Sequence, residues 1–233
     1  MGLGGTRTTV DLGLDDELEW VDLTLVAAAP VRSRGRSRAG ALAGPPGPSQ
    51  TVDSPPPAAP GELGPAMIAW LRRHPLWVRG TGPRILLVDL DNLRAGPGRW
   101  QARMDVVAWL ARVADHTVLA GQHAAVARAR PHLGALGERA HGVDDGSDLA
   151  DHVLLDAAEA IVANVARTVV ISNDGIFVRL AGRGPLTVVS PGLDALSDKL
   201  RTVASRVVDL TAVEESALIS LDAGAETVAA QRS

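Results

Sequence analysis

The chain has 233 residues, 46% of them hydrophobic, and a net charge of −4. This hydrophobic content is enough for a packed core, and the negative charge excludes recruitment of nucleic acid by a global positive field. The absence of cysteine excludes disulfides, thiolate zinc sites and cysteine nucleophiles. Since no window approaches the roughly 18 apolar residues of a membrane span, we expect a protein without a membrane partner, located in the reducing cytoplasm.

The first predicted segment, residues 1–62, is a low-complexity extension without stable structure. Within it, residues 11–26 mix acidic and hydrophobic side chains, a pattern that can fold on a protein partner, although a poorly ordered tail explains it more simply. Residues 44–60 are rich in proline, which predicts an extended spacer and a domain boundary. Residues 63–81 contain one short helix, ended by Pro75, that we expect to pack on the domain that follows.

Residues 82–210 alternate short apolar runs with amphipathic stretches. This alternation predicts an α/β domain with three layers, α/β/α, around a mostly parallel sheet of about five strands. The expected strands are 85–88, 117–120, 168–171, 186–189 and 206–208. The expected helices are 104–114, 124–130, 149–163, 175–181 and 195–203. Residues 211–233 form a C-terminal tail of weak periodicity, to which we assign no function.

Acidic and polar residues follow two of the predicted strands. The first strand leads into Asp89, Asp91 and Asn92, and the fourth leads into Ser172 and Asp174. In a parallel α/β sheet, ligands bind beyond the carboxyl ends of the strands, so these residues have a favourable position. Because side chains alternate along a strand, Asp89 and Asp91 should point to the same side of the chain, toward one site. Turn formation and helix capping explain each loop separately, but they do not require acids at both strand ends.

The helix predicted at residue 149 opens with a third acidic group. Asp148 and Asp151 are three positions apart, so in a helix they lie on one face. The helix dipole alone accounts for Asp144 and Asp145, because acids are favourable at helix N-termini. Asp156 lies further along the helix, where it either faces the inner end of this acidic cluster or flanks the cluster.

Clustered carboxylates repel one another, and a cation commonly neutralises them. With oxygen ligands and no cysteine, the expected cofactor is Mg²⁺ or Mn²⁺ rather than zinc. Such an ion can polarise a phosphodiester and activate a bound water, so the residues predict metal-assisted hydrolysis.

Three blocks of sequence resemble the NYN domains of the PIN-like nuclease superfamily, in that family's order, across roughly residues 84–210. They are LLVDLDNL at 86–93, SDLADHVLLDAAEAI at 147–161 and VVISNDGIFVRLAG at 169–182. The resemblance implies a PIN-like fold, a metal-dependent ribonuclease and RNA as the substrate.

The resemblance also implies roles for individual residues. Asp89 is the first metal-binding acid, Asp151 or Asp148 is the second, and Asp174 is the third. Asn92 positions the substrate or orients an acid. The set of implied ligands is therefore distributed over two strand ends and one helix.

In one position the chain departs from the family pattern. Many members carry another acid two residues after the equivalent of Asp174, and here that residue is Ile176. Asp91 is a candidate to compensate for it, and Ser172 supports Asp174 through its hydroxyl group. Phe177 matches a family position that also suits a core residue.

A second interpretation is a haloacid-dehalogenase-like phosphatase, because the stretch LLVDLDN of this chain also resembles the first motif of that family. In that family the first aspartate, here Asp89, is the nucleophile, and the second, here Asp91, is the acid/base. The family also needs a lysine followed by an acidic pair. Lys199 is present, but no convincing acidic pair follows it.

A third interpretation keeps the PIN-like fold without catalysis, as a module that binds RNA or a protein partner. Arg94, Arg99 and Arg103 follow the first acidic loop and are candidates to hold phosphate. They are equally explained as surface charges.

Overall fold

The structure is a computed structural model that describes residues 61–146, 148–161 and 166–230, the last six of these by their backbone only. The predictions made for the extension 1–60, including the partner-binding segment 11–26, lie outside the described residues. So do the expected helical residues 162 and 163 and the last three residues of the tail. Among the described residues, no helix is long and apolar enough to cross a membrane.

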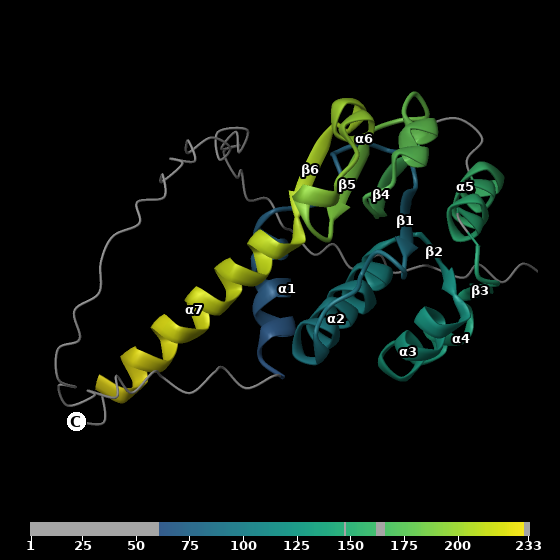
Figure 1. Cartoon of the computed structure of the whole chain (residues 1–233). Helices are drawn as coiled ribbons and strands as arrows, with labels where there is room; N and C mark the ends of the chain where they lie inside the picture. The colour runs from purple at the N-terminus through teal and green to yellow at the C-terminus, as the bar shows by residue number, and fades with distance from the viewer. Residues whose placement is uncertain (1–60, 147, 162–165, 231–233) are drawn as a thin grey trace, which may run out of the picture. The chain divides into compact units, whose positions relative to one another are not determined.

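Six parallel strands form one sheet in the order β3-β2-β1-β4-β5-β6. From β1 the chain moves outward to β2 and β3, returns to place β4 on the other side of β1, and then continues to β5 and β6 (Figure 1). The strands are β1 (Arg84–Asp89), β2 (His116–Gln122), β3 (His141–Val143), β4 (Arg167–Ile171), β5 (Leu186–Ser190) and β6 (Arg206–Asp209). The strand order therefore reverses between β1 and β4, and such a reversal leaves a crevice at the carboxyl edge of a sheet.

Helices cover both faces of this sheet, because alternate residues of each central strand enter different cores. In β1, Leu86 and Val88 belong to one buried cluster, and Ile85 and Leu87 belong to the other. The first cluster takes residues from α1 (Leu63–Arg73), α2 (Pro97–Val113), α3 (His123–Leu133) and α7 (Leu210–Ala230), with α4 (Ala135–Glu138) beside it. The second takes residues from α5 (Leu149–Ile161), the 3₁₀ helix η2 (Gly175–Leu180) and α6 (Asp198–Val203), with the 3₁₀ helix η3 (Leu193–Ala195) packed against it. The three-layer α/β/α prediction is confirmed.

The sheet has one strand more than the approximate count of five, and all of its pairings are parallel. The added strand is β3, three residues long, which pairs with the end of β2 through Ala120 and His141. Its sequence, HGV, has no apolar run that could predict a strand. The helix α2 also begins seven residues before the expected position, at Pro97, where a proline suits the first turn of a helix.

The ends of the described chain belong to the same fold. Helix α1 packs on both α2 and α7 (Figure 1), and it buries Met67 and Leu71 as expected for a helix that covers the domain. Residues 211–230, for which the sequence predicted no helix, continue as α7 and bury Val213 and Ala217. The first core therefore extends beyond the segment 82–210.

A buried ion pair joins α2 to α7. The Nε atom of Arg103 donates to Oε1 of Glu214 at 2.5 Å, and the two residues are 5% and 0% exposed. The same guanidinium donates to the backbone carbonyls of Arg94 and Pro191, both at 3.3 Å. The interpretation of Arg103 as a surface or phosphate-binding residue is therefore wrong, because its donors are used inside the fold.

Candidate metal centre

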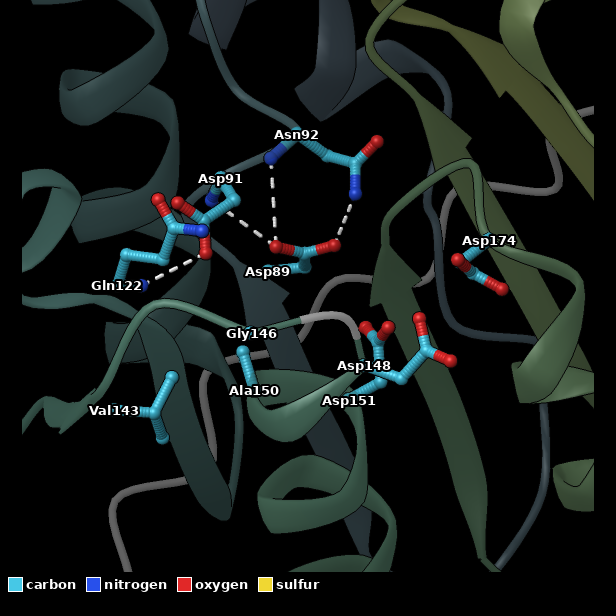
Figure 2. Close-up of a pocket in the computed structure, with 10 residues that line it drawn as sticks. All are labelled: Asp89, Asp91, Asn92, Gln122, Val143, Gly146, Asp148, Ala150, Asp151 and Asp174. Carbon is cyan, nitrogen blue, oxygen red and sulfur yellow. Dashed lines mark hydrogen bonds between the residues drawn. The ribbon is translucent and has the colours of Figure 1, made fainter.

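The crevice between the ends of β1 and β4 contains an acidic pocket of about 190 Å³. Figure 2 shows that its carboxylates come from three places: the end of β1, the loop after β4, and the beginning of α5. The residues that line it are Asp89, Asp91, Asn92, Gln122, Val143, Gly146, Asp148, Ala150, Asp151 and Asp174. The parallel sheet thus brings together at one edge the acids that the sequence placed after its strands.

Asp89, the last residue of β1, is 2% exposed and surrounded by donors. Its Oδ1 accepts the backbone N–H groups of Asp91 at 3.0 Å and of Asn92 at 3.4 Å. Its Oδ2 accepts the Asn92 side-chain amide and, at 3.0 Å, the hydroxyl of Ser172. Burial nevertheless raises the pKa of Asp89 above its usual value, while the hydrogen bonds from Asn92 and Ser172 act in the opposite direction. Both of its oxygens are therefore occupied by the protein.

The loop after β4 is organised by Ser172, which is fully buried. Besides donating to Asp89, its hydroxyl oxygen accepts the backbone N–H of Asp174 at 3.1 Å. Asp174 caps η2, because its Oδ1 accepts the backbone N–H of Ile176 at 2.9 Å. The sequence-based role of Ser172 as a support for Asp174 therefore has a physical basis, and the same hydroxyl also connects β4 to β1.

The beginning of α5 supplies two acids in different conformations. Asp148 lies before the helix with a φ of 64°, the left-handed region that residues other than glycine seldom adopt. The expectation that Asp148 and Asp151 share a helical face is therefore wrong, because the helix begins at Leu149. Asp151 is in the first turn, 6% exposed, and its Oδ1 has no hydrogen-bond partner among the described residues.

Asp151 has the most perturbed carboxyl group of the pocket. Burial, together with the nearby charges of Asp89, Asp174 and Asp148, raises its pKa to about 7. No arginine or lysine compensates its charge in the described part of the pocket. An ionised Asp151 is therefore unfavourable unless a cation binds beside it.

Three of these carboxylates lie close enough to share an ion. One oxygen from each of Asp148, Asp151 and Asp174 lies within 4.8 Å of the other two. Two oxygen ligands on opposite sides of a single ion are separated by roughly 4–5 Å, since metal–oxygen bonds are about 2.0–2.6 Å long. Oδ1 of Asp151, which has no hydrogen-bond partner among the described residues, is suited to be one of the ligands. The sequence offered Asp148 and Asp151 as alternatives, and the structure brings both to this group.

Asp89 is not part of this group of three, although its charge acts on Asp151. Of the four acids predicted as metal ligands, the structure thus gathers three as potential ligands and holds the fourth beside them by hydrogen bonds. Asp89 and Asn92 form a rigid unit at the end of β1, and Ser172 connects that unit to Asp174.

Asp91 connects the loop after β1 to the end of β2. Its Oδ2 accepts the backbone N–H of Gln122 at 2.8 Å, so its carboxylate turns away from Asp174 in Figure 2. Gly121 leaves room for this loop, since a Cβ atom there would lie 2.9 Å from Cβ of Leu90 and 3.4 Å from Oδ2 of Asp91. Sequence analysis did not include Gln122 in the site, although its place at the end of β2 could have suggested it. Asp156 is exposed on α5 and does not line the pocket.

The fold and this pocket define the protein's class as a parallel α/β protein with a cluster of carboxylates at its topological switch point. Comparison with known proteins finds no family model that matches the chain and no matching relative among curated proteins.

Proposed function

We propose that the protein is a metal-dependent ribonuclease that hydrolyses phosphodiester bonds at the acidic pocket. The observation that carries the proposal is Oδ1 of Asp151, a buried oxygen without a hydrogen-bond partner, within a group of three carboxylates. A charge buried in this way is unfavourable without a compensating ion. The resemblance to NYN domains supports RNA as the substrate. A cytoplasmic location agrees with the absence of cysteine and belongs to the same proposal.

The donor set favours Mg²⁺ or Mn²⁺ as the cofactor. All three candidate ligands offer carboxylate oxygens, which hard divalent cations prefer. A cation bound there would polarise the phosphodiester and lower the pKa of a bound water. The pocket lies open at the sheet edge, which leaves space for a phosphate group beside Asp148, Asp151 and Asp174.

The remaining residues orient this group. Asp89 receives four hydrogen bonds and fixes the end of β1, and Ser172 holds the β4 loop at a set position relative to it. Asn92 directs one amide hydrogen to Asp89, and its second amide hydrogen and its amide oxygen are left for a substrate or a water. These residues act through position rather than as ligands, which is a more specific assignment than the sequence permitted.

The hydrogen bonding of Asp89 argues against the phosphatase interpretation. A phosphatase of that class needs a nucleophilic oxygen free to attack, and both Asp89 oxygens accept hydrogen bonds. Its acid/base residue would be Asp91, whose Oδ2 is engaged with Gln122. Lys199, the remaining candidate for that motif, is exposed on α6.

The test is cleavage of a single-stranded RNA in Mn²⁺, with p-nitrophenyl phosphate as a parallel substrate. The variant is Asp151→Asn, and the matched control is Asp156→Asn on the exposed side of the same helix. We expect RNA cleavage by the wild type and by the control, and none above background by Asp151→Asn.

Hydrolysis of p-nitrophenyl phosphate without RNA cleavage would support the phosphatase instead. RNA binding without either activity would support a non-catalytic module, in agreement with Ile176 in place of the acid that many family members carry.

A further inference from the structure

A second cavity lies at the opposite, amino edge of the sheet. It has a volume of about 490 Å³, within the range of pockets that take small molecules. In a parallel α/β protein the helices run antiparallel to the strands, so helix C-termini gather at this edge. The cavity is accordingly bounded by the ends of α2, α3 and α5, by α4, and by the start of β2.

Two arginines facing this cavity have no partner in the described part of the chain. Arg112 lies in the last turn of α2 and Arg139 follows α4, and the side chain of neither makes a hydrogen bond or ion pair to a described residue. Asp115 also lines the cavity, but Arg84 binds its carboxylate through the backbone N–H, Nε and Nη2. Asp115, the acid nearest to Arg112 in sequence, is therefore engaged by Arg84. Glu138, the neighbour of Arg139, forms an ion pair with Arg130 at 3.6 Å.

The helix ends reduce the positive charge of the cavity without cancelling it. Each helix C-terminus contributes at most about half a negative charge, and this charge fades within one turn, so a helix end does not replace a counter-ion for either guanidinium group. Guanidinium groups bind phosphate or carboxylate oxygens in a bidentate manner.

The lining also contains the large apolar side chains of Leu133, Leu136 and Ile161, which we call the apolar wall. A ligand that contacts both the two arginines and the apolar wall has an anionic group and an apolar body.

We propose that this cavity binds a small phosphate monoester with an aromatic or apolar body, the chemistry of an aryl or nucleoside monophosphate. Arg112 and Arg139 hold the phosphate, and the apolar wall takes the body; His116 also lines the cavity. This site is separate from the acidic pocket, with which it shares no lining residue. The proposal does not depend on nuclease activity.

The test is an NMR titration of the ¹⁵N-labelled full chain in EDTA, so that no metal-bound phosphate forms at the acidic pocket. The probes are phenyl phosphate, inorganic phosphate and phenol. We expect phenyl phosphate to shift the resonances of Arg112, His116 and Arg139. It should bind about tenfold more tightly than inorganic phosphate or phenol, because only phenyl phosphate contacts both the arginines and the apolar wall.

The variant is the pair Arg112→Gln and Arg139→Gln. The matched control is Arg72→Gln with Arg73→Gln, two exposed arginines in the last turn of α1. We expect phenyl phosphate to bind about tenfold more weakly to the first pair and unchanged to the control. Equal binding to wild type and the first variant, or shifts confined to other residues, would overturn the proposal. Equal affinity for phosphate and phenyl phosphate would overturn the role of the apolar wall.

Discussion

Two of the described helices, α7 and α5, each bury a carboxylate, but only the carboxylate on α7 has a counter-charge beside it. On α7, Glu214 is fully buried and forms an ion pair with Arg103, which also binds two backbone carbonyls. On α5, Asp151 is nearly as buried, but its charged neighbours are three other aspartates. One oxygen of each carboxylate, Oε2 of Glu214 and Oδ1 of Asp151, has no hydrogen-bond partner among the described residues, but only the Glu214 oxygen has a cation nearby, Nη1 of Arg99 at 3.6 Å. A buried charge is unfavourable without a counter-charge. The two sites therefore differ in that Glu214 has arginine partners within the fold, whereas no arginine or lysine lines the described pocket around Asp151.

Glu214 is a structural carboxylate, whereas Asp151 is the carboxylate on which the proposed metal site depends. Glu214 has its partner within the fold and connects α2, α7 and two loops. An ionised Asp151 has no such partner, and carboxyl groups with a pKa raised in this way are frequent at functional sites. We therefore expect substitutions of Glu214 and Asp151 to change the stability in opposite directions.

The largest effect is expected for Glu214→Gln. Removing this charge leaves Arg103 buried without a counter-ion, which costs about 3–5 kcal/mol of the free energy of unfolding. Urea denaturation measures it, with Glu215→Gln, the exposed neighbour on α7, as the control. A loss no larger than that of the control would show that the Arg103–Glu214 pair does not stabilise the fold.

Asp151→Asn is expected to act in the opposite direction. Because the folded pKa of Asp151, about 7, lies above its ordinary value of 3.8, the folded state binds the extra proton between these values. The stabilisation from this proton is fully present below pH 3.8 and is lost as the pH rises through about 7. In EDTA at pH 8 the variant should therefore be more stable than the wild type, and at pH 5 the difference should shrink.

Thermal unfolding at pH 5 and pH 8 gives this comparison, and Asp156→Asn shows the effect of removing an exposed charge from the same helix. Added Mn²⁺ should reverse the order at pH 8, stabilising the wild type by about 2.7 kcal/mol when free Mn²⁺ is 100 times the dissociation constant. A wild type that Mn²⁺ does not stabilise would contradict the assignment of the metal centre.

A smaller effect is expected for Ser172→Ala, which removes the hydroxyl between β1 and β4. The backbone N–H of Asp174 and Oδ2 of Asp89 each lose one partner, which costs about 1–3 kcal/mol of stability. Mn²⁺ affinity should fall by roughly 10- to 100-fold, as expected for a residue that orients ligands. Calorimetric titration tests this, and Ser216→Ala, on α7 remote from the pocket in sequence, should retain the wild-type affinity.

The smallest effect is expected for Asp115→Asn. Hydrogen bonds from Arg84 lower the pKa of Asp115 to about 2, so its contribution is present above pH 3.8 and is lost as the pH falls through about 2. Because the pair is exposed, its stabilisation at neutral pH is small and screened by salt. Thermal unfolding at neutral pH should therefore differ little between this variant and the wild type, and a large drop would contradict solvent screening of the pair.

Much of the fold could be predicted because local sequence and tertiary environment agree there. The apolar β-branched runs form strands β1, β2, β4, β5 and β6, and residues at the strand ends meet at one edge because the sheet is parallel. β3 could not be predicted, since it is an edge strand of three residues stabilised by its pairing with β2. Helix α7 was also missed, because its burial depends on α1 rather than on a regular apolar pattern.

The sequence by itself determined which acids could take part in a site, because strand ends and helix starts are local features. Only the tertiary structure decided their roles. Asp89 is saturated by donors from its own loop and from β4, whereas Asp148 turns into the pocket through a left-handed backbone conformation. Whether a buried carboxylate is paired depends on contacts between segments far apart in the chain, as Arg103 and Glu214 also show. Such contacts follow from how the layers pack, which no single stretch of residues encodes.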